Sequence, residues 1–278
     1  MNAALNNRPI GAFDSGIGGL TVVKEMMELL PDEGLIYLGD TARVPYGNKS
    51  QETVIRYSRE CASFLLDKGI KLLVVACNTA SALSLEVLAE EVGVPVVGVV
   101  EPGARAALEA TRTGIIGVIG TSSTIRSGVY QRAIAARRPN VKVIARACPL
   151  FVPLAEEGWT DNEVARLATA VYLRDLKEQG MDTLVLGCTH YPLLKRVIAQ
   201  ELGDNITLVD SARQTAQEVN RLLVTNGLLA QTHTPGQHLF FLTDVSSMFI
   251  EVGKKFLAHP LGRVEKAELL PRAVGEKG

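Results

Sequence analysis

Short apolar segments rich in Val, Ile and Leu alternate with longer amphipathic segments along most of the chain. The short segments have the length and composition of strands, and near-continuous hydrophobicity is typical of parallel strands that are buried on both faces. The longer segments have the apolar spacing of helices. The pattern therefore predicts an α/β protein whose parallel sheets are flanked by helices.

Nine strands and nine helices are predicted from this alternation. The strands are expected near Ile10–Phe13, Leu35–Leu38, Leu72–Ala76, Val96–Val99, Ile115–Ile119, Val141–Ala145, Thr183–Leu186, Ile206–Val209 and His238–Leu242. The helices are expected near Gly19–Leu30, Ser50–Lys68, Ala80–Val92, Pro102–Ala110, Thr124–Arg137, Asp161–Gln179, Pro192–Leu202, Ala212–Asn226 and Ser247–Leu257. The charged segment from Lys254 onward is expected to be peripheral. Ligands of such folds bind beyond the carboxyl ends of the strands, so residues that directly follow a strand are the first site candidates.

The sequence contains an internal repeat that carries a cysteine. A predicted helix ends at Gly69 and another at Gly180, and in both cases a cysteine follows eight residues later, Cys77 and Cys188. The two cysteines are 111 positions apart, since 188 − 77 = 111. Self-similarity at a fixed offset indicates a duplicated unit. We therefore expect two pseudo-symmetric α/β lobes with the active site in the crevice between them.

Composition and charge disfavour a protein that binds nucleic acid, spans a membrane or is secreted. Lys and Arg number 29 against 30 Asp and Glu, a formal net charge of −1, which disfavours a nucleic-acid partner. The longest apolar segments, such as Leu72–Cys77, fall short of the roughly 18 residues that a membrane span needs. The polar first residues lack a signal-peptide core, so we expect a cytoplasmic protein with no membrane partner. In that reducing compartment its four cysteines are free thiols.

The four cysteines fall into two groups. Cys61 lies within a predicted helix and Cys148 precedes a proline, which favours a structural role as small buried side chains. Cys77 and Cys188 follow predicted strands and begin helices, where the helix dipole and free N–H groups lower the pKa of a thiol. This difference selects Cys77 and Cys188 as the candidates for chemistry.

Three uses of these two thiols compete. A disulfide between them is unusual in the cytosol. A single nucleophilic cysteine needs a base and a carbonyl substrate, and it leaves the second cysteine unexplained. Two thiols related by a pseudo-twofold suit racemisation, in which one thiolate removes an α-proton and the other thiol returns a proton to the opposite face.

Several polar residues near these cysteines are candidate helpers. Asp14 follows the first strand and opens a glycine-rich turn whose N–H groups can hold a carboxylate. His190 lies two residues after Cys188 and can accept or donate its proton. Tyr46 and Gly47 offer a phenol and a backbone N–H after the second strand, and Thr121 offers a hydroxyl at the repeat position of the glycine-rich turn.

Four motifs together resemble those of the glutamate racemases, within the wider aspartate/glutamate racemase superfamily. The resemblance covers Pro9 to about Asp244. The motifs are Asp14-Ser15-Gly-Ile-Gly-Gly, Gly39-Asp40-Thr-Ala-Arg-Val-Pro45-Tyr46-Gly47, Ala76-Cys77-Asn78-Thr79-Ala80-Ser81 and Leu186-Gly187-Cys188-Thr189-His190-Tyr191-Pro192.

The resemblance implies an isomerase that interconverts L- and D-glutamate without pyridoxal phosphate or a metal and supplies D-glutamate for peptidoglycan and thus for cell-wall biogenesis and cell shape. It implies a homodimer, and lobes formed by residues 1–99 with 210–278 and by residues 100–209. It makes Cys77 and Cys188 the acid/base pair, assisted by Asp14 and His190, with Glu156 and Asp40 as accessory candidates. The implied substrate-binding residues are Asp14, Ser15, Tyr46, Gly47, Asn78, Thr79, Thr121, Thr189 and His190.

Two alternatives stay open at this point. One is a racemase for aspartate or hydantoins that uses the same thiol pair. Related aspartate racemases usually carry Glu where His190 stands, which favours glutamate. The other alternative is a protein of a different class that binds an amino acid without exchanging its α-proton.

Overall fold

The computed structural model describes residues 6–231, 235–257 and 261–270. The chain divides into two compact units, one formed by Met1–Val99 with Ala212–Gly278 and the other by Val100–Ser211. We call these unit 1 and unit 2. The chain thus leaves unit 1 once, builds unit 2 as a continuous segment, and returns.

Unit 1 contains a six-stranded sheet in which all strand pairs are parallel. The strand order is β10-β9-β2-β1-β3-β4. The central strands are fully buried and apolar, as the sequence pattern predicts. The strands are β1 (Ile10–Asp14), β2 (Leu35–Gly39), β3 (Leu72–Val75), β4 (Val96–Gly98), β9 (His238–Leu242) and β10 (Val264–Lys266).

Unit 2 contains a four-stranded parallel sheet in the order β6-β5-β7-β8. Its strands are β5 (Ile115–Gly120), β6 (Lys142–Ala147), β7 (Thr183–Gly187) and β8 (Thr207–Val209). The order matches β2-β1-β3-β4 of unit 1 strand for strand, so β3 corresponds to β7. Cys77 follows β3 and Cys188 follows β7, and the cysteine repeat in the sequence is therefore a repeat of topology. The predicted fold class is confirmed.

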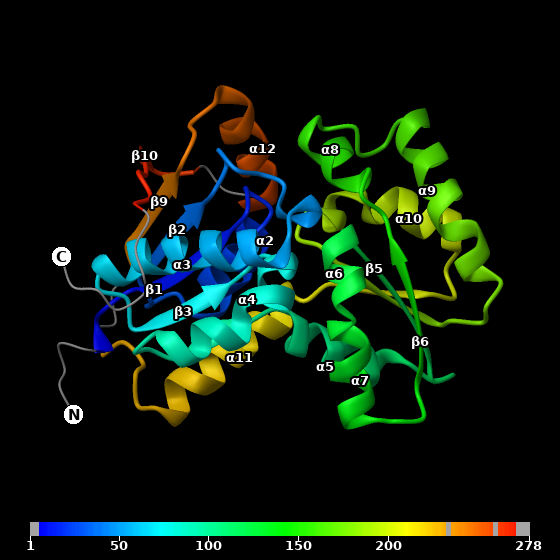
Figure 1. Ribbon diagram of the computed structural model, residues 1–278, viewed down its shortest axis with the longest axis horizontal. Helices are drawn as coiled ribbons and strands as arrows, with labels where there is room; N and C mark the ends of the chain where they lie inside the picture. The colour runs from blue at the N-terminus through cyan, green and yellow to red at the C-terminus, as the bar shows by residue number, and fades with distance from the viewer. Residues whose placement is uncertain (1–5, 232–234, 258–260, 271–278) are drawn as a thin grey trace. The chain divides into compact units, whose positions relative to one another are not determined.

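Helices cover the sheets of both units (Figure 1). In unit 1, α3 packs against α4 and α2 packs against α11, and in unit 2, α9 packs against α10 and α5 against α7. The unit 1 helices are α2 (Leu20–Leu29), η1 (Tyr46–Asn48), α3 (Gln51–Asp67), α4 (Asn78–Glu91), α11 (Ala212–Thr225) and α12 (Ser247–Leu257). The unit 2 helices are α5 (Val100–Ala110), α6 (Ser122–Ser127), α7 (Val129–Arg137), α8 (Phe151–Glu156), α9 (Glu163–Lys177), η2 (Tyr191–Leu194) and α10 (Lys195–Leu202).

Two helix predictions need correction, and one helix was not predicted. The single helix expected over Thr124–Arg137 is two helices, because Gly128 adopts φ 65° and ends α6 in the left-handed region that glycine tolerates. The helix expected from Pro192 starts as the 3₁₀ turn η2 before α10. Helix α8 was not predicted, because its six residues are too few to show a helical period.

The expectation that the chain from Lys254 onward is peripheral is wrong in part. Strand β10 pairs with β9, and Ala267 next to it is only 3% exposed and belongs to the core of unit 1. Phe256 and Leu257 of α12 are also buried. A three-residue strand with the sequence Val-Glu-Lys has too little apolar character to be recognised before its partner strand is known.

Among the described residues, no helix is long and apolar enough to cross a membrane.

Candidate active site

Cys77 lies at the start of α4, two residues beyond the end of β3. It is the N-cap of this 14-residue helix, and its Sγ accepts a hydrogen bond from the Ala80 N–H at 3.5 Å. The thiol donates to Ser15 Oγ, also at 3.5 Å. A sulfur at a helix N-terminus, facing a backbone N–H, is placed where negative charge is favoured. The predicted location of Cys77 at a strand end and helix start is confirmed.

Asp14 ends β1 and is completely buried. Its Oδ2 accepts hydrogen bonds from the N–H groups of Gly16, at 3.2 Å, and Gly19, at 3.0 Å. A Cβ at position 19 would lie 2.7 Å from the Asp14 Cβ, so the turn needs glycine there to fold over the carboxylate. Asp14 therefore shapes the glycine-rich turn that also carries Ser15, the hydrogen-bond partner of Cys77.

The segment after β2 is held by a buried polar network centred on Asp40. The Tyr46 hydroxyl donates to Asp40 Oδ2, and so does Arg43 Nε, at 2.6 Å. Thr243 Oγ1 donates to Asp40 Oδ1 at 3.0 Å. Tyr46 is only 1% exposed, and burial, together with the neighbouring Cys61 and the hydrogen-bonded carboxylate of Asp40, raises the pKa of its phenol well above the ordinary value. The Tyr46 phenol is thus hydrogen-bonded within unit 1.

Cys188 has a different environment in unit 2. It follows β7 directly, but the next helical element is the short 3₁₀ turn η2 rather than a long α-helix, which differs from the expected helix start. The Cys188 Sγ lies 3.8 Å from His190 Nδ1. On the other side of the ring, His190 Nε2 lies 3.2 Å from Glu156 Oε1 at the end of α8. This second contact is an ion pair whose atoms are not aligned as a hydrogen bond. Thiol, imidazole and carboxylate therefore form a continuous row within unit 2.

The pKa of His190 is raised from 6.5 to about 10. Burial of the ring lowers this pKa, but the hydrogen bond to Cys188 and the contact with Glu156 raise it and outweigh burial. The folded protein therefore holds a proton on His190 that the unfolded chain releases near pH 6.5. The stability that this proton contributes is complete below about pH 6.5 and is lost as the pH rises through about 10.

The remaining predicted binding residues lie beside these groups. Asn78 and Thr79 open α4 directly after Cys77, and Thr189 lies between Cys188 and His190. Thr121 is the N-cap of α6, and its Oγ1 accepts from the Thr124 N–H at 3.4 Å. The predicted residues thus form two clusters, one at the carboxyl end of the unit 1 sheet and one at that of unit 2.

The sequence did not single out Tyr37 as a supporting residue. Tyr37 lies in β2 and is 1% exposed, and its hydroxyl donates to the Gly16 carbonyl at 2.9 Å beneath the glycine-rich turn. Its only sequence signal is one phenol in an otherwise apolar strand, which does not reveal the partner. Burial raises the pKa of Tyr37 well above its ordinary value, so the hydroxyl remains a donor.

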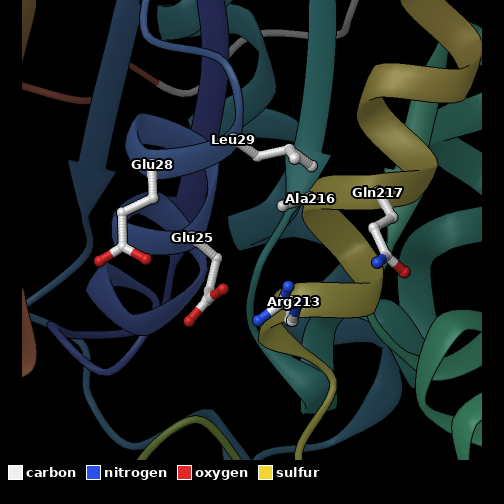
Figure 2. A pocket seen from close by; sticks show the side chains of 6 residues that line it. All are labelled: Glu25, Glu28, Leu29, Arg213, Ala216 and Gln217. Atoms are coloured by element: carbon white, nitrogen blue, oxygen red, sulfur yellow. The ribbon is translucent and has the colours of Figure 1, made fainter.

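A surface cavity of about 230 Å³ lies between α2 and α11 and contains none of the predicted site residues (Figure 2). It is lined by Glu25, Glu28, Leu29, Arg213, Ala216 and Gln217. Within the described part of the chain, no three His, Cys, Asp or Glu side chains are grouped so that they could hold a metal ion.

Comparisons with known proteins identify the family of this chain. The family model for Asp/Glu/Hydantoin racemase matches residues 17–219. A glutamate racemase from Geobacter metallireducens is 60% identical over 262 residues, which cover 94% of this chain and 97% of the relative.

Solved structures show the same similarity. The crystal structure of glutamate racemase from Francisella tularensis in complex with D-glutamate has a TM-score of 0.90 and 38% identity, covering 95% of this chain and 98% of that one. The glutamate racemase from Thermus thermophilus, solved in complex with β-chloro-D-alanine, has a TM-score of 0.84 and 46% identity, covering 95% and 98%. The resemblance seen in the motifs is confirmed, and the chain belongs to the Asp/Glu/Hydantoin racemase family.

Proposed function

We propose that this racemase interconverts L-glutamate and D-glutamate, with Cys77 and Cys188 as the two acid/base residues. The observation that supports this proposal most strongly is the placement of each thiol after a corresponding strand of two sheets with the same strand order. Two copies of one structural unit can supply one thiol to each face of a substrate carbon. The relatives named as glutamate racemases, at up to 60% identity, support the choice of substrate.

In the proposed reaction one cysteine enters as thiolate and the other as thiol. The thiolate takes the α-proton of glutamate, and the electron pair of the broken C–H bond stays on the α-carbon, delocalised into the adjacent carboxylate. The opposite thiol then donates its proton to the other face of that carbon and becomes a thiolate. No proton or electron is gained or lost overall, and the two thiols have exchanged roles. The reverse direction uses the same groups in the opposite order.

The neighbouring groups have distinct proposed roles. The Ala80 N–H and the α4 N-terminus stabilise negative charge on Cys77, and the imidazolium of His190 does so for Cys188. Glu156 acts through His190 by stabilising its protonated form. The hydroxyl, side-chain amide and backbone N–H donors of Ser15, Gly47, Asn78, Thr79, Thr121 and Thr189 bind the carboxylates of the substrate, and the hydroxyl and side-chain amide oxygens in this set accept from its ammonium. Asp14 shapes the turn that carries Ser15.

The experiment is incubation of purified protein with L-glutamate in deuterated water, with no added cofactor. We expect D-glutamate, detected by chiral chromatography, with deuterium at its α-carbon. L-Aspartate and hydantoins are assayed in parallel. If the protein racemises either of them faster than glutamate, that compound is the substrate and the glutamate assignment is wrong. Binding of glutamate with no α-proton exchange would support the non-catalytic alternative and reject the racemase assignment.

The cellular role proposed from the family resemblance is supply of D-glutamate for peptidoglycan by a cytoplasmic homodimer. Rescue of a bacterium that depends on added D-glutamate tests the metabolic role. Wild-type protein should restore growth, and the Cys77→Ala variant should not.

A further inference from the structure

Arg43 joins the segment after β2 to helix α3. Its Nε donates to Asp40 Oδ2 at 2.6 Å, and its Nη1 donates to the buried carboxylate of Glu60. The guanidinium lies over the ring of Tyr57, with Cζ 4.0 Å from the ring centroid. Glu60 and Tyr57 are three positions apart on α3, so they meet Arg43 from one face of that helix. One side chain therefore holds the segment in place from two sides.

The same contacts reach the residue next to Gly47. Asp40 Oδ2 also accepts from the Tyr46 hydroxyl, so Arg43 and Tyr46 share one carboxylate oxygen. The Tyr46 ring also packs on Tyr57, with the two ring centroids 5.5 Å apart. Gly47 directly follows Tyr46 in the 3₁₀ turn η1. The backbone of Gly47 is therefore placed by the cluster that Arg43 holds together.

We propose that Arg43 is a positioning residue for substrate binding, whose guanidinium fixes the backbone N–H of Gly47 where it binds a carboxylate of glutamate. This role rests on the proposed function, in which Gly47 binds the substrate. The Arg43 side chain is 21% exposed, and its Nε and Nη1 are already bonded to carboxylates of the protein. Arg43 thus acts through the segment that it holds and does not itself touch the substrate.

Arginine suits this role and lysine does not. A guanidinium is a planar fork that can donate to two carboxylates from different nitrogens while its face lies on an aromatic ring. An ammonium on a flexible stem cannot keep all three contacts in one geometry. Asp40 is 0% exposed and Glu60 is 7% exposed, so a cation between them also offsets buried negative charge. Arg43→Lys should therefore keep the charge balance and lose the fixed geometry.

Steady-state kinetics of Arg43→Lys with L-glutamate and with D-glutamate test the proposal. KM should rise at least about tenfold in both directions, the size of one charge-assisted hydrogen bond, while kcat changes less than about threefold. This split is expected because a backbone N–H on a spectator carboxylate binds ground state and transition state alike. Arg56→Lys is the matched control and should leave KM unchanged, because Arg56 is exposed and lies farther from the Tyr57 ring, 5.2 Å from its centroid.

Two further pairs of variants test the partners on α3. Tyr57→Phe keeps the ring against the guanidinium and should leave KM unchanged, whereas Tyr57→Leu should raise it. Glu60→Gln still offers an oxygen to Nη1 of Arg43, so it should raise KM less than Glu60→Ala does. In the Arg43→Lys background, Glu60→Ala should add little, because a residue that acts through Arg43 loses its effect when Arg43 is replaced.

A loss of stability alone would not give this pattern. Asp182→Ala is the control for stability, because Asp182 accepts hydrogen bonds from Thr111 Oγ1 at 2.6 Å and from the Thr113 N–H at 2.7 Å. These bonds lie just before β7, at the end of the strand opposite to Cys188. Asp182→Ala should lower the free energy of unfolding and leave KM unchanged. Denaturant unfolding of every variant provides the stability against which its KM is compared.

The outcomes separate this role from the proposed function. Wild-type protein that exchanges no α-proton rejects the racemase assignment, and calorimetry of glutamate binding then measures whether Arg43→Lys raises the dissociation constant. Folded Arg43→Lys protein with unchanged KM and unchanged dissociation constant would overturn the positioning role, and so would a loss confined to kcat. If Arg43→Lys does not fold, unchanged KM in both Tyr57→Leu and Glu60→Ala would overturn it. Wild-type protein that neither racemises nor binds glutamate would overturn both proposals.

Discussion

Cys77 in unit 1 and Cys188 in unit 2 follow corresponding strands of two sheets with the same strand order, but different groups surround them. Cys77 caps a long α-helix, where its sulfur accepts a hydrogen bond from the Ala80 N–H and lies at the positive end of the α4 dipole. Cys188 precedes a short 3₁₀ turn and faces His190, which in turn contacts Glu156. One cysteine is thus supported by backbone dipoles that do not titrate, and the other by a side chain that does.

This difference shows how a duplicated fold can keep one geometry and change its electrostatics. The strand end fixes where the sulfur lies in each unit. The element after the strand decides how negative charge on that sulfur is stabilised, either by a helix N-terminus or by an imidazolium. The two halves are therefore expected to respond differently to pH and to substitution.

The largest expected effect comes from removing either thiol. Cys77→Ala and Cys188→Ala should each reduce kcat/KM at least about 10²-fold, the usual scale for loss of an acid/base group. Polarimetry or circular dichroism of the substrate measures the rate in both directions. Because the equilibrium constant between enantiomers is one, kcat/KM must fall equally in the two directions for any variant.

Cys148→Ala is the matched control for the thiol variants. Cys148 is buried in unit 2, and burial raises its pKa to about 12, so it carries no thiolate near neutral pH. We expect its activity to remain close to that of the wild type. Normal activity in Cys77→Ala or Cys188→Ala would remove that residue from the mechanism.

The next largest effect is expected from substitution of His190, which lies beside Cys188 in unit 2, whereas the sulfur of Cys77 accepts from the Ala80 N–H in unit 1. His190→Gln should lower kcat/KM by about 10- to 100-fold, because it removes the group that stabilises Cys188 but leaves the α4 terminus at Cys77 intact. The variant should also lack the decline in stability between about pH 6.5 and 10 that His190 gives the wild type. Denaturant unfolding across this pH range measures the second result.

Glu156→Gln tests the last member of the Cys188–His190–Glu156 row. Removing the carboxylate should lower the pKa of His190 from about 10, because Glu156 helps to raise it. With four histidines in the chain, the imidazole signals can be followed by NMR. An unchanged titration midpoint in Glu156→Gln would show that Glu156 does not act through His190.

A smaller effect is expected from Asp14→Asn in unit 1. The Asn side-chain oxygen can accept the same N–H groups of Gly16 and Gly19, so the free energy of unfolding should change little. If the negative charge of Asp14 acts in the chemistry, kcat/KM should still fall by about tenfold. If the free energy of unfolding falls together with kcat/KM, the role of Asp14 is to shape the turn alone.

The smallest effect on rate is expected from Tyr46→Phe. The phenol bonds to buried Asp40, so its loss should cost about 1–3 kcal/mol of stability while kcat/KM changes less than about threefold. Chemical denaturation and the racemase assay measure the two quantities. A large loss of activity with unchanged stability would mean that the hydroxyl itself meets the substrate.

The sequence was sufficient to predict the strands and helices whose hydrophobic pattern lies within one continuous segment. Buried strands such as Leu72–Val75 are uniformly apolar, and the repeated Gly and Cys spacing predicted the shared topology of the two sheets. Strand β10 was missed because its pairing with β9 is a long-range property of a short polar segment. Helix α8, which carries Glu156, was missed because it is short and contains Pro153.

The sequence selected the candidate residues but did not show the environment of each one. Cys77 and Cys188 looked alike in sequence, since each follows a strand and precedes polar residues. That α4 continues for 14 residues after Cys77, whereas η2 spans four after His190, depends on the packing of each unit. For the same reason the sequence could not show that the Tyr46 phenol bonds to Asp40 and that Tyr37 supports Gly16.

The most direct test of a separate thiol for each face is the location of deuterium early in the reaction. Wild-type protein is incubated with L-glutamate in deuterated water and stopped before about a tenth is converted, and both enantiomers are analysed by mass spectrometry. Two opposed bases predict deuterium in the D-glutamate formed and almost none in the recovered L-glutamate. Equal deuterium in product and recovered substrate would indicate a single base that serves both faces and would contradict the account.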